Sequence, residues 1–155
     1  MANLFMARAI ALAVRNVRTG RGGPFGAVVV KNGKIIAEGA NEVTASHDPS
    51  AHAEIVAIRK ACQKLGSFEL RGCQIYTSCE PCPMCMGAIY WARPSRVYYA
   101  GKRRDAEQAG FDDSLIYREL TRPLSRRRIP MKPLMRREGL AAFVAWRAAA
   151  GKVEY

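Results

Sequence analysis

Two short segments carry side chains that could together bind a metal ion. One is His52-Ala53-Glu54, and the other is Pro81-Cys82-Pro83-Met84-Cys85. One imidazole and two thiolates make three zinc ligands, and three protein ligands leave a fourth position for water, as in catalytic zinc sites. Zinc lowers the pKa of a bound water from about 16 to about 7, so that hydroxide becomes available near neutral pH. The spacing therefore predicts a catalytic zinc site with His52, Cys82 and Cys85 as ligands.

Glu54 lies two residues after the predicted histidine ligand, so its carboxylate could accept and return the proton of the same water. H-x-E followed by P-C-x-x-C is typical of zinc-dependent nucleobase deaminases. Cys79 extends the cysteine series at the same spacing, but position 89 is Ile where an iron–sulfur ligand set would need a fourth cysteine. We therefore expect Glu54 to transfer protons and Cys79 to be a packed neighbour of the site.

The hydrophobic pattern predicts the elements that position these residues. Apolar residues recur at helical spacing over residues 51–65, and either Asp48 or Ser50 could be the N-cap of that helix. An apolar strand over 73–77 precedes a second helix over 81–91, whose prolines suit a first turn. Both ligand groups would then stand at helix N-termini, where the helix dipole favours thiolate over thiol.

The other elements follow from turn and periodicity signals. Asn32-Gly33 is a strong hairpin signal between two apolar runs. The remaining expected elements are a helix over 1–18, a loop over 19–24, strands over 25–30, 35–39 and 96–100, a polar loop over 41–50, and a helix over 140–150 that Gly151 ends. This order predicts an α/β fold in which helices cover a sheet, as a single domain over residues 1–155.

Composition excludes several classes of protein. A chain of 155 residues that is 49% hydrophobic can bury a core and is not intrinsically disordered. No apolar run approaches the roughly 18 residues of a membrane-spanning helix. Arg8 interrupts the apolar start of the chain, which does not fit a signal peptide, so we expect a cytoplasmic protein without a membrane partner.

The net charge of +12 is unevenly distributed along the chain. The segment from Arg118 to Arg137 holds eight basic residues and one acid, Glu119, and so carries +7 of the total. A basic segment can bind nucleic acid or another anion. Because this segment lies outside the metal-binding motifs, we interpret it as a solvated surface and expect nucleic acid not to be a partner.

Segments beyond the metal motifs carry a family resemblance. They are Gly22–Val30 (GGPFGAVVV), Asp48–Glu54 (DPSAHAE), Tyr76–Pro94 (YTSCEPCPMCMGAIYWARP), Gly110–Tyr117 (GFDDSLIY), Ala145–Arg147 and Val153–Tyr155. Together they resemble the bacterial guanine deaminase family of the cytidine-deaminase-like superfamily. The resemblance implies a three-layer α-β-α sandwich with a central mixed sheet and one zinc ion per subunit. It also implies hydrolytic deamination of guanine to xanthine and ammonia, in purine catabolism or salvage.

The resemblance also assigns roles to individual residues. It implies that Glu54 and Asp113 are the catalytic proton-transfer groups, with Asp113 serving the leaving amino group. The residues implied to hold or cover the purine are Phe25, Asn41, the backbone of Ala53, Trp91, Asp113 and Tyr155. It further implies a homodimer that exchanges its C-terminal segments, here the basic segment 118–155, so that Tyr155 closes the site of the neighbouring subunit.

Three alternative functions stay open at this point. A tRNA adenosine deaminase shares HAE and PCxxC and would suit a basic surface, although GFDDSLIY does not fit that enzyme. Another free-base deaminase, acting on an aminopyrimidine or a triazine, would need a similar pocket for a small planar amine. A zinc-stabilised nucleic-acid-binding module is a different class, which would have four protein ligands and would unfold without zinc.

Overall fold

The structure is a computed structural model that describes residues 3–155 and divides into two compact units, Met1–Asp113 and Ser114–Tyr155. The first unit contains α1 (Leu4–Arg18), β1 (Gly26–Lys31), β2 (Lys34–Ala40), α2 (Val43–Ser46), α3 (Ala53–Leu65), β3 (Cys73–Cys79), α4 (Pro83–Ala92), β4 (Arg96–Gly101) and α5 (Arg103–Gln108). The second contains α6 (Ser114–Leu120), the 3₁₀ helix η1 (Leu124–Arg126) and α7 (Arg136–Ala148).

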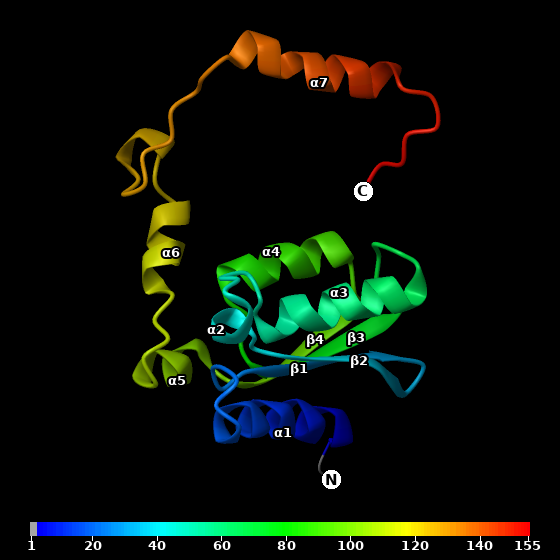
Figure 1. Ribbon diagram of the computed structural model, residues 1–155, viewed down its shortest axis with the longest axis vertical. Helices are drawn as coiled ribbons and strands as arrows, with labels where there is room; N and C mark the ends of the chain where they lie inside the picture. The colour runs from blue at the N-terminus through cyan, green and yellow to red at the C-terminus, as the bar shows by residue number, and fades with distance from the viewer. Residues whose placement is uncertain (1–2) are drawn as a thin grey trace. The chain divides into compact units, whose positions relative to one another are not determined.

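The sheet of the first unit has the strand order β2-β1-β3-β4. β1 runs antiparallel to both β2 and β3, while β4 runs parallel to β3, so the sheet is mixed. Helix α1 covers one face of the sheet, and α3 and α4 cover the other (Figure 1). This arrangement confirms the predicted α/β class and the three-layer sandwich that the family resemblance implied.

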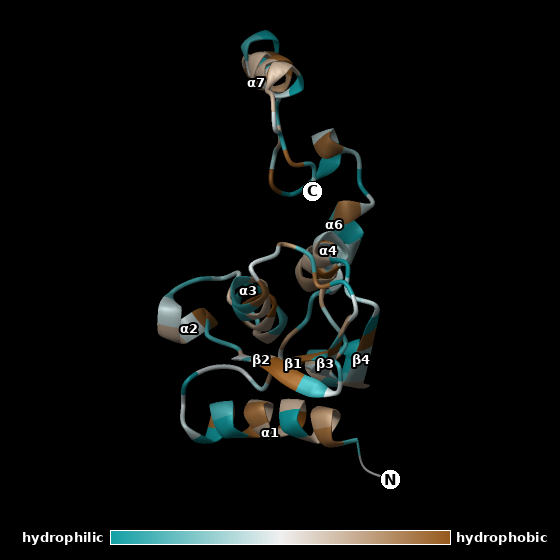
Figure 2. Cartoon of the chain, turned by 90° about the vertical axis from the view of Figure 1, so that its right-hand side faces the viewer, coloured by the Kyte–Doolittle hydropathy of each residue, from teal (hydrophilic) through white to brown (hydrophobic). Residues whose placement is uncertain are grey.

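Alternate residues of β1 enter two separate hydrophobic cores. Ala27 and Val29 pack in the core beneath α3 and α4, whereas Val28 and Val30 pack against α1. A strand buried on both faces has no polar face, which is why β1 reads as a continuous apolar run. Figure 2 shows the brown, hydrophobic segments in the middle of the sheet above α1, a helix along which hydrophilic and hydrophobic residues alternate.

Two glycines allow the helices to approach the sheet closely. A Cβ atom at Gly26 would lie 2.3 Å from the Ala9 carbonyl oxygen in α1. A Cβ atom at Gly39 would lie 2.2 Å from the Ala53 carbonyl oxygen at the start of α3. Only a residue without a side chain fits such a contact between two backbones, so Gly39 helps to set the depth at which His52 and Glu54 stand over the sheet.

Several predicted boundaries of elements were wrong. Neither Asp48 nor Ser50 is the N-cap of α3, because Asp48 instead accepts hydrogen bonds from the backbone and hydroxyl of Ser50 at 2.8 and 2.7 Å, and the helix begins only after His52. The predicted loop 41–50 contains the short helix α2. The last helix, α7, begins earlier than predicted and ends before Gly151, which lies in a turn at φ +70°.

No residue of the second unit, 114–155, is buried. Its apolar side chains are exposed instead, among them Leu134, Phe143, Val144 and Trp146. None of the helices in the described part of the chain is long and apolar enough to cross a membrane.

Candidate metal centre and active site

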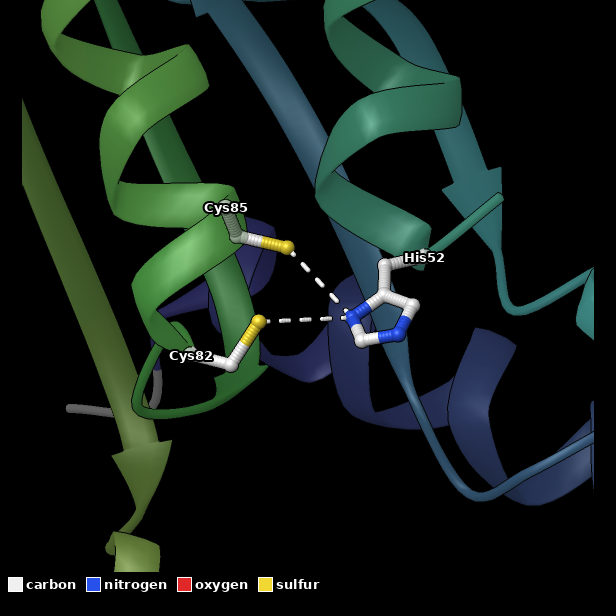
Figure 3. Close-up of side chains that lie close together, drawn as sticks. All are labelled: His52, Cys82 and Cys85. Carbon is white, nitrogen blue, oxygen red and sulfur yellow. Dashed lines mark hydrogen bonds between the residues drawn. The ribbon is translucent and has the colours of Figure 1, made fainter. Parts of the chain in front are cut away.

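The predicted metal ligands stand at the starts of two neighbouring helices. His52 is the N-cap residue of α3 and Cys82 is the N-cap residue of α4, with Cys85 in the first turn of α4. Both N-cap residues have extended backbone, and neither side chain caps its own helix. Figure 3 shows the result: the two cysteine sulfurs point from α4 toward the ring of His52.

The spacing of the three side chains fits a zinc ion. The Sγ atoms of Cys82 and Cys85 each lie 3.5 Å from Nδ1 of His52, and all three ligand atoms lie within 4.8 Å of one another. Bonds of about 2.3 Å to sulfur and about 2.0 Å to nitrogen, at tetrahedral angles, separate such ligands by roughly 3.5 Å. The donor set and its geometry therefore match three ligands of a tetrahedral zinc site.

The two thiols differ sharply in acidity. Hydrogen bonding from Cys85, aided by His52, lowers the pKa of Cys82 to about 4 despite its burial. The same contact with Cys82, followed by burial, raises the pKa of Cys85, while the contact with Cys82 raises the pKa of His52. One thiolate is thus available at neutral pH, and zinc binding would release protons from the other ligands.

Glu54 is buried directly beside the ligands, with 5% of its surface exposed. Its Oε1 accepts a hydrogen bond from the Thr77 hydroxyl at 3.0 Å, and its Oε2 accepts one from the Cys85 thiol at 3.5 Å. Burial raises the pKa of Glu54. A carboxyl group with a raised pKa can both accept and return a proton near neutral pH, as acid–base catalysis requires.

Asp113 is the last residue of the first unit, and its carboxyl group interacts electrostatically with Cys82. Burial raises its pKa, the Arg103 guanidinium opposes that shift, and the charge of Cys82 adds to it. Two residues before Asp113, the ring of Phe111 packs edge-on against Phe25 with ring centres 5.0 Å apart. The Phe111–Asp113 segment is therefore held against the loop before β1.

Three other predicted substrate residues belong to the first unit. Asn41 is buried, and its Oδ1 accepts hydrogen bonds from the backbone of Gly23 at 3.4 Å and of Val43 at 3.3 Å. Ala53 is fully buried next to His52. Trp91 lies on α4 with 62% of its surface exposed, so its ring is not packed in the hydrophobic core. Tyr155 belongs to the second unit, and its side chain is exposed.

The sequence did not indicate two residues that contact Glu54 and Asp113. Thr77 is 1% exposed and hydrogen bonds to Glu54, and Arg103 faces Asp113. Period-two alternation along β3 could have indicated Thr77, because it shares the inward face of Ile75. No sequence signal pairs Arg103 with Asp113. Cys79 was predicted to be a packed neighbour of the site. It is buried, its Sγ donates a hydrogen bond to the Lys102 carbonyl, and it is not part of the ligand group.

Comparison with known proteins agrees with this geometry. Residues 1–101 match the family described as the cytidine and deoxycytidylate deaminase zinc-binding region. The chain is 58% identical over 151 residues to guanine deaminase of Bacillus subtilis, covering 97% of each protein. It matches the crystal structure of guanine deaminase from Bacillus subtilis with a TM-score of 0.96 at 57% identity, covering 99% of each chain. The chain belongs to the guanine deaminase branch of the cytidine and deoxycytidylate deaminase family.

Membership in this family indicates which metal the site binds. It also explains why the chain resembles guanine deaminase over a longer stretch than it resembles other deaminases. Zinc is the cofactor, and the His52, Cys82 and Cys85 group is able to bind it. The tRNA-specific adenosine deaminase of Agrobacterium fabrum is 46% identical over 79 residues, which cover 51% of this chain and 52% of that protein. The similarity to guanine deaminase extends over nearly the whole chain, including the second unit.

Proposed function

We propose that this protein is a zinc-dependent enzyme that hydrolyses guanine to xanthine and ammonia in the cytoplasm. The observation that carries the proposal is the extent of the similarity. Identity of 58% to guanine deaminase covers 97% of the chain, including the GFDDSLIY segment, whereas the similarity to tRNA-specific adenosine deaminase covers only 51%. Because the metal site is common to deaminases, the residues outside it decide the substrate.

The proposed mechanism uses Glu54 and Asp113 as separate proton-transfer groups. His52, Cys82 and Cys85 would hold the zinc ion, which would supply a water activated for attack on C2 of guanine. Glu54 takes a proton from that water and passes it to N3 of the ring, a role that its burial beside Cys85 supports. The ionised Asp113 then takes the proton of the hydroxyl group added at C2 and passes it to the amino group, so that the C2–N bond breaks, ammonia leaves and the C2 carbonyl of xanthine forms. Thr77 orients the Glu54 carboxylate through its hydrogen bond.

The purine is proposed to lie among Phe25, Asn41, the backbone of Ala53 and Trp91. Aromatic rings cover the flat faces of a purine, and amide groups recognise its edge. The buried side chain of Asn41 and the half-buried ring of Phe25 suit those roles, because both are held in place by neighbours. The exposed ring of Trp91 suits a covering role.

We further propose a homodimer in which the second units are exchanged and Tyr155 closes the neighbouring site. The apolar side chains of residues 114–155 support this proposal, because none is buried within its own chain; Leu134 is 88% and Met135 is 66% exposed. Helix α4 also exposes Tyr90 and Trp91. Apolar surface of this extent marks a protein interface.

Substrate specificity is tested by ammonia release from guanine, adenine, cytosine, ammeline and tRNA, measured side by side on the zinc-loaded protein. We expect guanine to have the highest kcat/KM. Faster turnover of tRNA would support the adenosine deaminase alternative, and faster turnover of cytosine or ammeline would support another free-base deaminase. Either result would refute the guanine proposal while leaving the deaminase family unchanged.

Removing Val153–Tyr155 is expected to lower guanine turnover by about tenfold or more, because a closed site orients substrate and excludes water. Steady-state kinetics check this result, with zinc content and melting temperature as controls for folding. Lys152→Ala, which retains Tyr155, should leave the rate unchanged.

Mixed dimers test whether the segments are exchanged. A subunit carrying Glu54→Gln keeps Tyr155, and a subunit lacking Val153–Tyr155 keeps Glu54. If each tail closes the neighbour's site, mixing these impaired forms raises turnover, because one site of each mixed dimer then has both Glu54 and Tyr155. Confirmed mixed dimers without restored activity would contradict the exchange.

A further inference from the structure

One oxygen of Asp113 is buried without a hydrogen-bond partner among the described residues. This atom, Oδ1, faces Nε of Arg103 at 3.8 Å, a distance of ionic attraction but too long for a hydrogen bond. The Asp113 side chain is 17% exposed, whereas that of Arg103 is 44% exposed. Leaving a buried carboxylate oxygen without a donor is costly, so the position is suited to accept a hydrogen bond from a ligand.

The backbone of Arg103 is fixed to the segment that carries the metal ligands. Its N–H donates to Oε2 of Glu80 at 3.0 Å, and the N–H of Glu80 donates to the Gly101 carbonyl at 2.8 Å. Glu80 directly precedes the PCPMC motif. The turn between β4 and α5 is therefore hydrogen bonded to the residue that precedes the metal-binding motif.

We propose that Arg103 is a positioning residue that holds the carboxylate of Asp113 toward the reacting amino group of the substrate. The guanidinium attracts the ionised carboxylate from the α5 side without occupying the hydrogen-bonding position of Oδ1. That oxygen stays available to an N–H group of the purine. The inference rests on the proposed role of Asp113 in proton transfer and adds the residue that orients it.

The packing contacts of Phe111 hold the backbone of the segment that leads to Asp113. The Phe111 backbone N–H donates to the Ala106 carbonyl at 2.9 Å, and the Phe111 ring packs against Phe25. These contacts fix the backbone that leads to Asp113 but do not touch its carboxylate. Arg103 forms an ion pair with that carboxylate, and its backbone is hydrogen bonded to Glu80 beside the metal-binding motif.

The test compares Arg103→Met, which keeps an unbranched flexible side chain but removes its charge, with Arg103→Lys, which keeps a charge. In the zinc-loaded full chain, Arg103→Met is expected to lower kcat for guanine by about tenfold, with KM changed by less than about threefold. Arg103→Lys should recover part of the loss. Arg104→Met is the matched control, since Arg104 is the exposed next residue of α5, and its kinetics should be unchanged.

A double-mutant cycle with Asp113→Asn separates this inference from the role of Asp113 itself. If Arg103 acts through Asp113, adding Arg103→Met to Asp113→Asn should lower kcat by less than about twofold further. An undiminished tenfold loss in that background would overturn the inference, as would wild-type kcat in folded Arg103→Met. Wild-type kcat in Asp113→Asn would instead refute the proposed role of Asp113. Zinc content and melting temperature of each variant exclude misfolding as the cause.

Discussion

Glu54→Gln is expected to lower kcat for guanine by roughly 10²–10⁴-fold, the usual contribution of a positioned acid–base group. Glutamine has nearly the same shape and can still accept the hydrogen bond from Thr77, but it cannot carry a proton from water to the substrate. The substitution also removes a carboxyl group whose burial raises its pKa. The folded state should therefore be at least as stable as that of the wild type, and only the chemical step should be lost.

Three measurements check this expectation: steady-state kcat, zinc per chain and the melting temperature. Glu107→Gln is the matched control, because it makes the same chemical change on the exposed surface of α5 and should leave kcat unaltered. Substantial activity in Glu54→Gln with zinc bound would remove Glu54 from the mechanism. Loss of zinc would show instead that its carboxylate acts mainly by supporting the ligands.

Cys82→Ser is expected to abolish both stable zinc binding and turnover. Cys82 supplies the thiolate that already forms at neutral pH, since its pKa is lowered to about 4, and a serine hydroxyl is not among the ligands that zinc takes in such sites. The two hydrophobic cores do not include Cys82, so the folded chain should persist. Its melting temperature should fall only by the amount that bound zinc had contributed.

Cys62→Ser is the matched control for Cys82→Ser, because Cys62 is half-buried on α3 and is not part of the ligand group. It should keep zinc and activity. Metal analysis and circular dichroism with and without a chelator distinguish a catalytic from a structural site. Complete unfolding on zinc removal would favour the zinc-stabilised binding module, in which metal binding supplies the folding free energy. A folded, inactive apoprotein supports the catalytic assignment.

The sequence alone was sufficient to predict the candidate metal site and the main helices and strands. His52, Cys82 and Cys85 could be identified because zinc needs specific ligand types, and short spacings at helix starts bring them together locally. The hairpin at Asn32-Gly33 was predictable for a similar reason: both residues adopt positive φ, at +49° and +70°, which few other residue types tolerate. Each of these features depends on a few neighbouring residues.

The boundaries of helices and of the two units depend on interactions that the local sequence does not reveal. His52 occupies the N-cap of α3 although better capping residues precede it, because its ring turns toward the cysteines and Asp48 is engaged by Ser50. The division at Asp113 and the exposure of residues 114–155 have no sequence signature, since the amphipathic pattern of α7 predicts burial without saying against what.

The sequence by itself determined the chemistry that could be proposed for this protein: a zinc ion, three candidate ligands and a carboxyl group beside them. Only the tertiary structure decided which groups tune that chemistry. Thr77 reaches Glu54 across 23 positions of the chain because β3 lies beneath α3, and Arg103 meets Asp113 because the chain turns back after α5. Such pairings arise from packing between distant elements, whereas metal ligation depends on residue type and short spacing.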